Sequence, residues 1–250
     1  MEIKIHKKLL IDLEKISYSY PGSSNNVLDN LTLKFYQGDH LGLIAPNGSG
    51  KTTLFHIIMG LLKPRCGQIN IYGNKVDTEK DFRSVRKKIG FLFQDADDQL
   101  FCPTVIEDVA FGPLNLGKSK KEAVDISHET LDLLGLNGFE NRITFKLSGG
   151  EKRLVSLASV LAMQPEILLL DEPTTGLDIN TKERLIEILT KLDLSYIVIS
   201  HEFDFISAVS HHLYTMEKGK IITDEKLHIH QHIHGHKYGE QPHKHHDASK

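Results

Sequence analysis

The chain is poor in cysteine, in long apolar runs and in clustered positive charge. Its 250 residues include two cysteines, Cys66 and Cys102, which lack CxxC spacing and indicate free thiols in a reducing cytosol. No apolar run approaches the roughly 18 residues of a membrane span, and no signal segment opens the chain, so we expect neither membrane insertion nor export. The net charge of −3 comes without a basic stripe, so we expect no nucleic acid as a partner.

A loop of small residues follows the aliphatic run from Leu41 to Ile44 and nearly fits the P-loop pattern. The residues predicted to bind a nucleotide here are Ala45, Pro46, Asn47, Gly48, Ser49, Gly50, Lys51, Thr52 and Thr53. Backbone N–H groups of such a loop surround phosphates, while Lys51 neutralises the β- and γ-phosphates and Thr52 places its hydroxyl on Mg²⁺. Ala45 stands where the pattern has its first glycine, so the turn there must use backbone angles that alanine tolerates. The alternative is an ordinary glycine-containing turn between a strand and a helix.

Two further aliphatic runs have the length of strands buried on both faces of a parallel sheet. The run from Ile167 to Leu170 leads into Asp171 and Glu172, and the run from Tyr196 to Ser200 leads into His201. Ligands of open α/β sheets sit at the carboxyl ends of the strands, so these side chains are expected near the phosphates. We predict that Asp171 holds Mg²⁺, that Glu172 deprotonates the attacking water, and that His201 is catalytic rather than merely structural.

Ser148, Gly149, Gly150 and Glu151 open a segment with helical spacing that extends to Met163. The start of a helix attracts anions. However, the far end of this helix leads through Pro165 into the strand that carries Asp171. We therefore expect these four residues to act on a nucleotide held by a second chain.

Together these motifs resemble the nucleotide-binding subunit of an ABC transporter over about residues 10 to 225. The resemblance implies an α/β fold with a P-loop NTPase core of mainly parallel strands, an antiparallel β layer and a helical subdomain near residues 100–165. Alternating apolar residues within residues 3–40 agree with the β layer. The resemblance also implies a head-to-tail dimer, with itself or with a homologous ATPase subunit, that encloses two ATP molecules with Mg²⁺.

The same resemblance identifies Ser148, Gly149, Gly150 and Glu151 as part of the family's signature motif, and it assigns further residues. Asp178 matches the D-loop, His201 the switch histidine, and Gln94 the Q-loop glutamine that touches Mg²⁺. Tyr20 matches the aromatic residue that stacks on adenine, with an edge-strand tyrosine as the alternative. Glu151 stands where many family members have glutamine, and an ionised carboxylate cannot donate a hydrogen bond, so we expect altered contacts without loss of hydrolysis.

Residues 93–101, 103–105 and 108–113 resemble the ATPases of energy-coupling-factor (ECF) importers, which take up vitamins and transition metals. This implies integral membrane partner subunits, a peripheral position on the cytoplasmic face of the membrane, and a surface around Asp97 to Phe101 that receives the partner. The alternative is a solvated loop followed by the first turn of a helix.

The last 23 residues hold eight of the fifteen histidines. These are His228, His230, His232, His234, His236, His243, His245 and His246. Neutral imidazole suits nickel, copper, zinc and cobalt, and a resemblance to the cobalt/nickel branch of the importers selects cobalt or nickel as cargo. We therefore divide the chain into an ATP-binding domain, 1–227, and a flexible tail, 228–250. A disordered polar tail or a purification tag is the alternative for this segment.

Three other functions remain open from the sequence. One is an ECF ATPase for a vitamin or another substrate. A second is a soluble ABC ATPase of the chromosome-maintenance or DNA-repair kind, although 250 residues leave no room for the long coiled coil that such chains need. A third is a metal-storage protein that binds nucleotide, which would not explain Glu172, His201 and the signature together.

Overall fold

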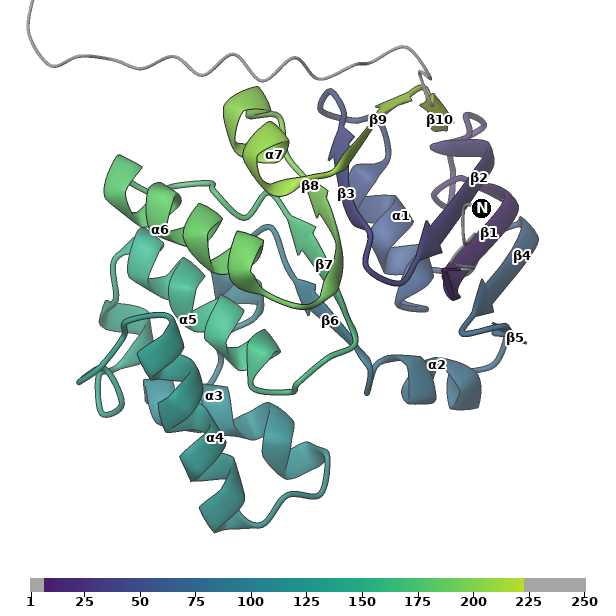
Figure 1. Ribbon diagram of the computed structural model, residues 1–250. Coiled ribbons are helices and arrows are strands. Elements are labelled where there is room, and N and C mark those ends of the chain that lie inside the picture. Colours follow the sequence, from purple (N-terminus) through teal and green to yellow (C-terminus); the bar gives the residue numbers. More distant parts are fainter. Residues whose placement is uncertain (1–6, 223–250) are drawn as a thin grey trace, which may run out of the picture.

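The computed structural model describes residues 7–222 and contains an antiparallel sheet near its N-terminus (Figure 1). Its strands, in the spatial order β2-β1-β4-β5, are β1 (Leu9–Tyr18), β2 (Leu28–Tyr36), β4 (Cys66–Ile71) and β5 (Asn74–Lys75). Along β2, Leu31, Leu33 and Phe35 are buried and alternate with exposed residues, because successive side chains of a strand point to opposite faces. The predicted antiparallel layer is therefore confirmed. The strands β4 and β5 extend it beyond the segment expected from the sequence.

A second sheet carries the functional motifs. Its strands, in the spatial order β10-β9-β3-β8-β7-β6, are β3 (His40–Ile44), β6 (Ile89–Leu92), β7 (Ile167–Asp171), β8 (Ser195–Ile199), β9 (His212–Glu217) and β10 (Lys220–Ile222). All neighbours pair in parallel except β9 and β10. Every residue of β6, β7 and β8 is buried, as continuous aliphatic strands covered on both faces should be.

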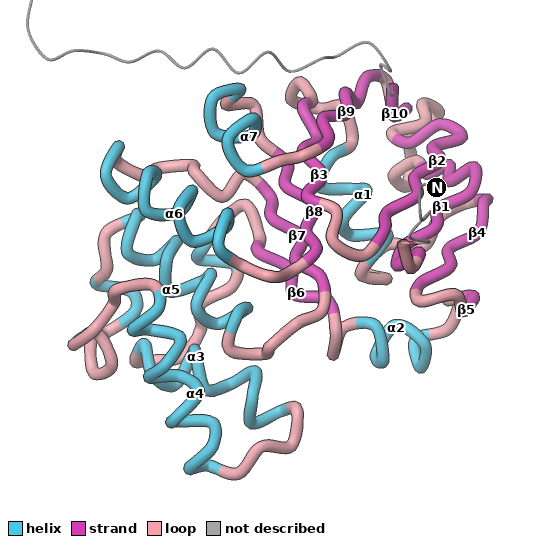
Figure 2. The backbone as a smooth tube through the Cα atoms, in the orientation of Figure 1, coloured by secondary structure: helices cyan, strands magenta, loops and turns pink. Residues whose placement is uncertain are grey.

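Helices cover this sheet on both faces, so that the molecule has two apolar cores. The helix α1 (Lys51–Ile58) packs in one core with residues of both sheets, and α2 (Glu79–Val85) joins the edge of that core. The second core lies under α3 (Val105–Asn115), α5 (Gly149–Leu161), α6 (Ile179–Lys191) and α7 (Phe203–Val209), and α4 (Lys120–Leu133) packs against α3 and α5 and adds Leu131 to it. Figure 2 shows the resulting separation of strands from the helical subdomain formed by α3, α4 and α5.

Within residues 7–222, the structure contains no helix that is both long enough and apolar enough to cross a membrane. The histidine-rich segment 228–250 lies outside the described residues, as does the start of the chain before Lys7.

Candidate nucleotide-binding and catalytic site

The phosphate loop runs from the end of β3 to the first residue of α1. Gly48 and Gly50 have φ angles of 78° and 98°, in the left-handed region that favours glycine. A Cβ on Gly50 would also lie 2.8 Å from Leu28 Cδ2, so no larger residue fits there. Ala45 is buried and does not adopt a positive φ, so the turn does use angles that alanine tolerates.

Lys51 reaches from the first turn of α1 back across the loop. Its Nζ donates to the carbonyl of Ala45 at 2.9 Å and to Glu172 Oε1 at 3.3 Å. The side chains of Lys51 and Glu172 are only 8% and 4% exposed, so each charge depends on the other for compensation. The ammonium is thus held at the mouth of the loop where phosphate oxygens would bind.

Asp171, the last residue of β7, faces Thr52. The hydroxyl of Thr52 donates to Asp171 Oδ2 at 2.7 Å, while Asp171 Oδ1 is buried and has no hydrogen-bond partner among the described residues. Burial raises the pKa of the Asp171 carboxyl above its usual value, against the hydrogen bond from Thr52, which lowers it. An unpartnered carboxylate oxygen beside a hydroxyl fits a hard cation such as Mg²⁺, which prefers oxygen ligands.

Glu172 lies between Lys51 and His201. Its Oε2 is 2.9 Å from His201 Nδ1, and its own φ of 46° places it in the left-handed region, which is costly for a residue with a Cβ. The side chain of His201 is 65% exposed, so its ring can reach a ligand in the open site. The Glu172 carboxylate thus lies at the edge of the phosphate loop, with one oxygen held by Lys51 and the other by His201.

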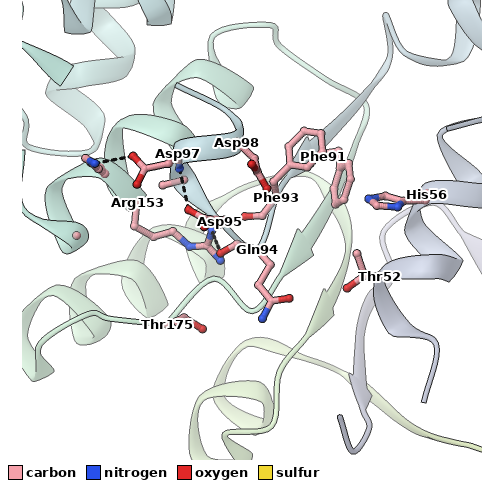
Figure 3. Close-up of a pocket in the computed structure, with 13 residues that line it drawn as sticks. Thr52, His56, Phe91, Phe93, Gln94, Asp95, Asp97, Asp98, Arg153 and Thr175 are labelled. Atoms are coloured by element: carbon pink, nitrogen blue, oxygen red, sulfur yellow. Dashed lines mark hydrogen bonds and ion pairs between the residues drawn. The ribbon is translucent and has the colours of Figure 1, made fainter. Parts of the chain in front are cut away.

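The space above the loop is a cavity of about 460 Å³. It is lined by Tyr20, Val27, Asn47, Gly48, Gly50, Lys51, Thr52, Thr53 and Gln94. The hydroxyl of Tyr20 is 3.0 Å from Thr53 Oγ1, and 43% of Tyr20 is exposed at the cavity rim, where a flat ring can stack on it. Figure 3 shows the Gln94 side chain extending toward Thr52 from a neighbouring cavity of about 770 Å³, which these two residues also line.

The signature residues stand apart from the phosphate loop. Ser148 caps α5, and its side chain accepts from Glu151 N–H, while Glu151 Oε2 accepts from Ser148 N–H at 2.7 Å. Asp178 likewise caps α6 by accepting from Thr181 N–H at 3.1 Å. Within the described part of the chain, the side chain of Lys51 donates to Ala45 and Glu172 and to none of these residues, so their contact with a nucleotide of a second chain stays a prediction.

Two arginines were missed by the sequence reasoning. Arg142 Nη1 donates to Glu151 Oε1 at 2.7 Å, and this hydrogen bond holds the pKa of the Glu151 carboxyl below its usual value. The Glu151 carboxylate is therefore ionised and already accepts hydrogen bonds from Arg142 and Ser148 of its own chain. Arg153, on the same helix, donates to backbone carbonyls beside Gln94 and Glu172. The S-x-x-E pattern from Ser148 to Glu151 could have predicted the cap, but no sequence signal marks the targets of Arg153.

A phosphate loop between β3 and α1, with two acidic residues ending a parallel strand, defines a P-loop nucleotide-hydrolysing protein. The family model described as ABC transporter matches residues 28–175, which is more than half of the chain. The chain therefore belongs to the ABC transporter ATP-binding family, whose fold is the one seen here and whose members are ATPases.

Individual relatives agree with this assignment. A putative ABC transporter ATP-binding protein of Nitratidesulfovibrio vulgaris is 51% identical over 90% of this chain and 83% of its own length. The energy-coupling factor transporter ATP-binding protein EcfA of Methanothermobacter thermautotrophicus is 43% identical over 86% of this chain and 70% of its own. Among solved structures, the cassette MJ0796, described as a dimer in a post-hydrolysis state bound to ADP and Pi, is 28% identical with a TM-score of 0.78. That match covers 85% of this chain and 96% of the other.

The eight histidines predicted as metal ligands, from His228 to His246, lie outside the described residues. Among residues 7–222, no group of three or more histidine, cysteine, aspartate or glutamate side chains is arranged to hold a metal ion.

Proposed function

We propose that this chain is the ATP-hydrolysing subunit of an ECF-type importer for cobalt or nickel ions, bound to the cytoplasmic face of the membrane. The observation that carries the proposal is the Glu172 carboxylate, which lies 3.3 Å from Lys51 and 2.9 Å from His201 at the edge of the phosphate loop. This is the position that a general base needs in order to accept a proton from a water beside the γ-phosphate.

Each polar group of the site has a role in hydrolysis. Lys51 moves from Glu172 to the phosphates when the nucleotide binds, which frees one carboxylate oxygen for the attacking water. His201 keeps the other oxygen oriented. Thr52 and Asp171 hold Mg²⁺, which when bound neutralises charge on the phosphates, and Gln94 lines the same space. Tyr20 supports the adenine ring.

The site is completed by a second copy of this chain or by a homologous ATPase subunit. Support comes from the start of α5 at Ser148, Gly149 and Gly150, which within residues 7–222 makes no hydrogen bond to the phosphate loop of its own chain. MJ0796 is described as dimeric with ADP and Pi. In a head-to-tail dimer the signature and Asp178 of one chain face the nucleotide of the other, and the helix N-terminus stabilises its negative charge.

A groove on the other side of the Q-loop is the docking surface for the membrane subunit. It is a cavity of about 350 Å³ whose lining includes Phe93, Gln99, Phe101, Phe111 and Met163. The side chains of Phe101 and Phe111 are 65% and 46% exposed and meet edge to face with ring centroids 4.7 Å apart. Exposed aromatic side chains that line one hollow mark an interaction surface. An apolar helix of a transporter subunit fits it.

The proposed cargo rests on the tail and on the resemblance to the cobalt/nickel branch of the importers, while residues 93–101, 103–105 and 108–113 support only the ECF type. Eight histidines in residues 228–250 supply ligands that suit cobalt and nickel. EcfA of Methanothermobacter thermautotrophicus is named as an energy-coupling factor transporter protein, which supports the transporter type without specifying a substrate.

Uptake into liposomes tests this function. The chain is co-expressed with candidate ECF membrane subunits from the same organism, reconstituted, and supplied with Mg-ATP and either cobalt, nickel or a vitamin. We expect the chain to co-purify with the membrane subunits and one of the two metals to accumulate only with ATP. Vitamin uptake without metal uptake would contradict the cargo alone, and failure to associate with any membrane subunit would contradict the transport function.

A further inference from the structure

Arg153 is a buried arginine that faces the catalytic strand from the second turn of α5. Only 3% of it is exposed, although arginine is rarely fully buried without a partner. It lies five residues after Ser148 on a helix whose other buried residues, such as Leu154 and Leu157, are apolar except for Ser156. A guanidinium buried here must be compensated by hydrogen-bond partners, because packing alone does not offset the cost of burying its charge.

The guanidinium of Arg153 is satisfied entirely by backbone carbonyls of two segments. One set belongs to the Q-loop: Nη1 donates to the carbonyls of Phe93 and, at 3.1 Å, of Gln94. The other set belongs to the end of β7: Nη2 donates to the carbonyls of Asp171, at 2.6 Å, and Glu172. Nε completes this second set by donating to the carbonyl of Pro173 at 3.2 Å.

The hydrogen bonds from Arg153 reach the strained backbone at Glu172. Glu172 has a φ of 46°, and the two carbonyls on either side of that torsion are held by Nη2. A planar fork can hold two carbonyls at once, which a single ammonium cannot. Burial lowers the pKa of Arg153 to about 10, so the guanidinium remains charged at neutral pH and its hydrogen bonds stay charge-assisted.

Gln99 fixes the Q-loop to the same helix by separate contacts. Its Oε1 accepts from Phe93 N–H at 3.2 Å, and its Nε2 donates to the carbonyl of Ser156 at 2.8 Å and to Ser159 Oγ at 3.0 Å. Arg153 and Gln99 therefore both attach the Q-loop to α5, whereas within residues 7–222 the side-chain hydrogen bonds from α5 to the backbone at Glu172 come from Arg153 alone.

We propose that Arg153 is a positioning residue for ATP hydrolysis, which holds the backbone of Glu172 in its left-handed conformation and fixes it relative to the Q-loop. Through this contact the helix that begins with the signature also sets the place of the general base. A displacement of α5 relative to β7 moves Glu172 away from Lys51 and His201. The inference rests on the proposed role of Glu172 as the base, but not on the cargo or the membrane partner.

The test compares Arg153→Lys and Arg153→Met with the wild-type full chain. Turnover is divided by the amount of protein that binds ATP in calorimetry, so that unfolded protein does not count. Lysine keeps the charge but cannot hold both carbonyl sets, so we expect kcat to fall about tenfold or more, and further with methionine, while ATP affinity changes less than about threefold. Arg184→Lys is the matched control, because Arg184 is an exposed arginine on α6 outside the site.

The split between kcat and ATP affinity separates positioning from a structural role, because a folded variant that misplaces Glu172 still binds ATP but turns it over slowly. Normal turnover in Arg153→Lys and Arg153→Met, or a loss of ATP affinity large enough to account for the whole loss of turnover, would overturn the proposal. Glu172→Gln is measured in parallel, and its full activity would reject Glu172 as the base whatever Arg153 does.

Discussion

The cavity above the phosphate loop and the groove beside Phe101 are lined by adjacent residues of the Q-loop, but their surfaces differ in chemistry. The cavity is charged, and the groove is apolar. Gln94 lines the cavity, where the charges of Lys51 and Glu172 are buried and paired. Its neighbour Phe93 lines the groove, where Phe101 and Phe111 are left exposed. One region thus fixes paired charges, and the other leaves apolar surface exposed. We therefore expect single substitutions to separate hydrolysis from the proposed docking, although adjacent residues serve the two.

The largest expected effect comes from the carboxylate of Glu172. Glu172→Gln keeps the shape and the contacts to the phosphate loop but removes the base, so kcat should fall by about 10²- to 10⁴-fold with ATP affinity nearly unchanged. Steady-state turnover and ATP binding at equilibrium measure the two quantities. Glu166→Gln is the control, since Glu166 lies just before β7 and pairs with Lys88 at the surface. Hydrolysis near the wild-type rate in Glu172→Gln would remove Glu172 from the mechanism.

A smaller effect is expected in the groove. Phe101→Ala removes a side chain that is 65% exposed and touches Phe111, so the affinity for the membrane subunit should fall about tenfold. Turnover of the isolated chain should stay within about twofold, because Phe101 lines no part of the phosphate cavity. Binding to the detergent-solubilised membrane subunit is measured beside Leu133→Ala, which removes an exposed apolar side chain on α4 outside the groove. Equal loss of ATPase in the isolated Phe101→Ala protein would show that Phe101 belongs to the core instead.

The smallest effect on hydrolysis is expected from the tail. Deletion of residues 228–250 removes none of the sequence motifs predicted to touch ATP, so turnover should not change. Nickel or cobalt binding to the isolated chain should fall sharply, and binding by the full chain should weaken below about pH 6.5, because protonated imidazole cannot ligate. Calorimetry on both chains measures this. Equally tight metal binding by the shortened chain would place the metal site elsewhere.

Local patterns in the sequence predicted most of the fold and the catalytic strand ends. Continuous aliphatic runs predicted β7 and β8, and helical spacing predicted α5, because both patterns reflect burial of the element itself. Arg153 could not be assigned, because its carbonyl partners lie up to 60 residues away in the chain and have no sequence signature. The strand β5, with only two residues, is too short to show any period.

The central claim is an ATPase site that one chain cannot complete, and mixing two inactive variants tests it most directly. Lys51→Ala disables the phosphate loop and Gly150→Asp disables the signature. A Cβ on Gly150 would lie 3.6 Å from Leu177 Cδ2, an ordinary contact, so this position accepts a side chain within its own chain. When the two variants are mixed in equal amounts, about half of the dimers contain one chain of each variant. Each such dimer has one intact site of two, so about a quarter of the wild-type turnover should return. No recovered turnover, in a mixture where labelled chains are shown to form mixed dimers, would contradict the shared site.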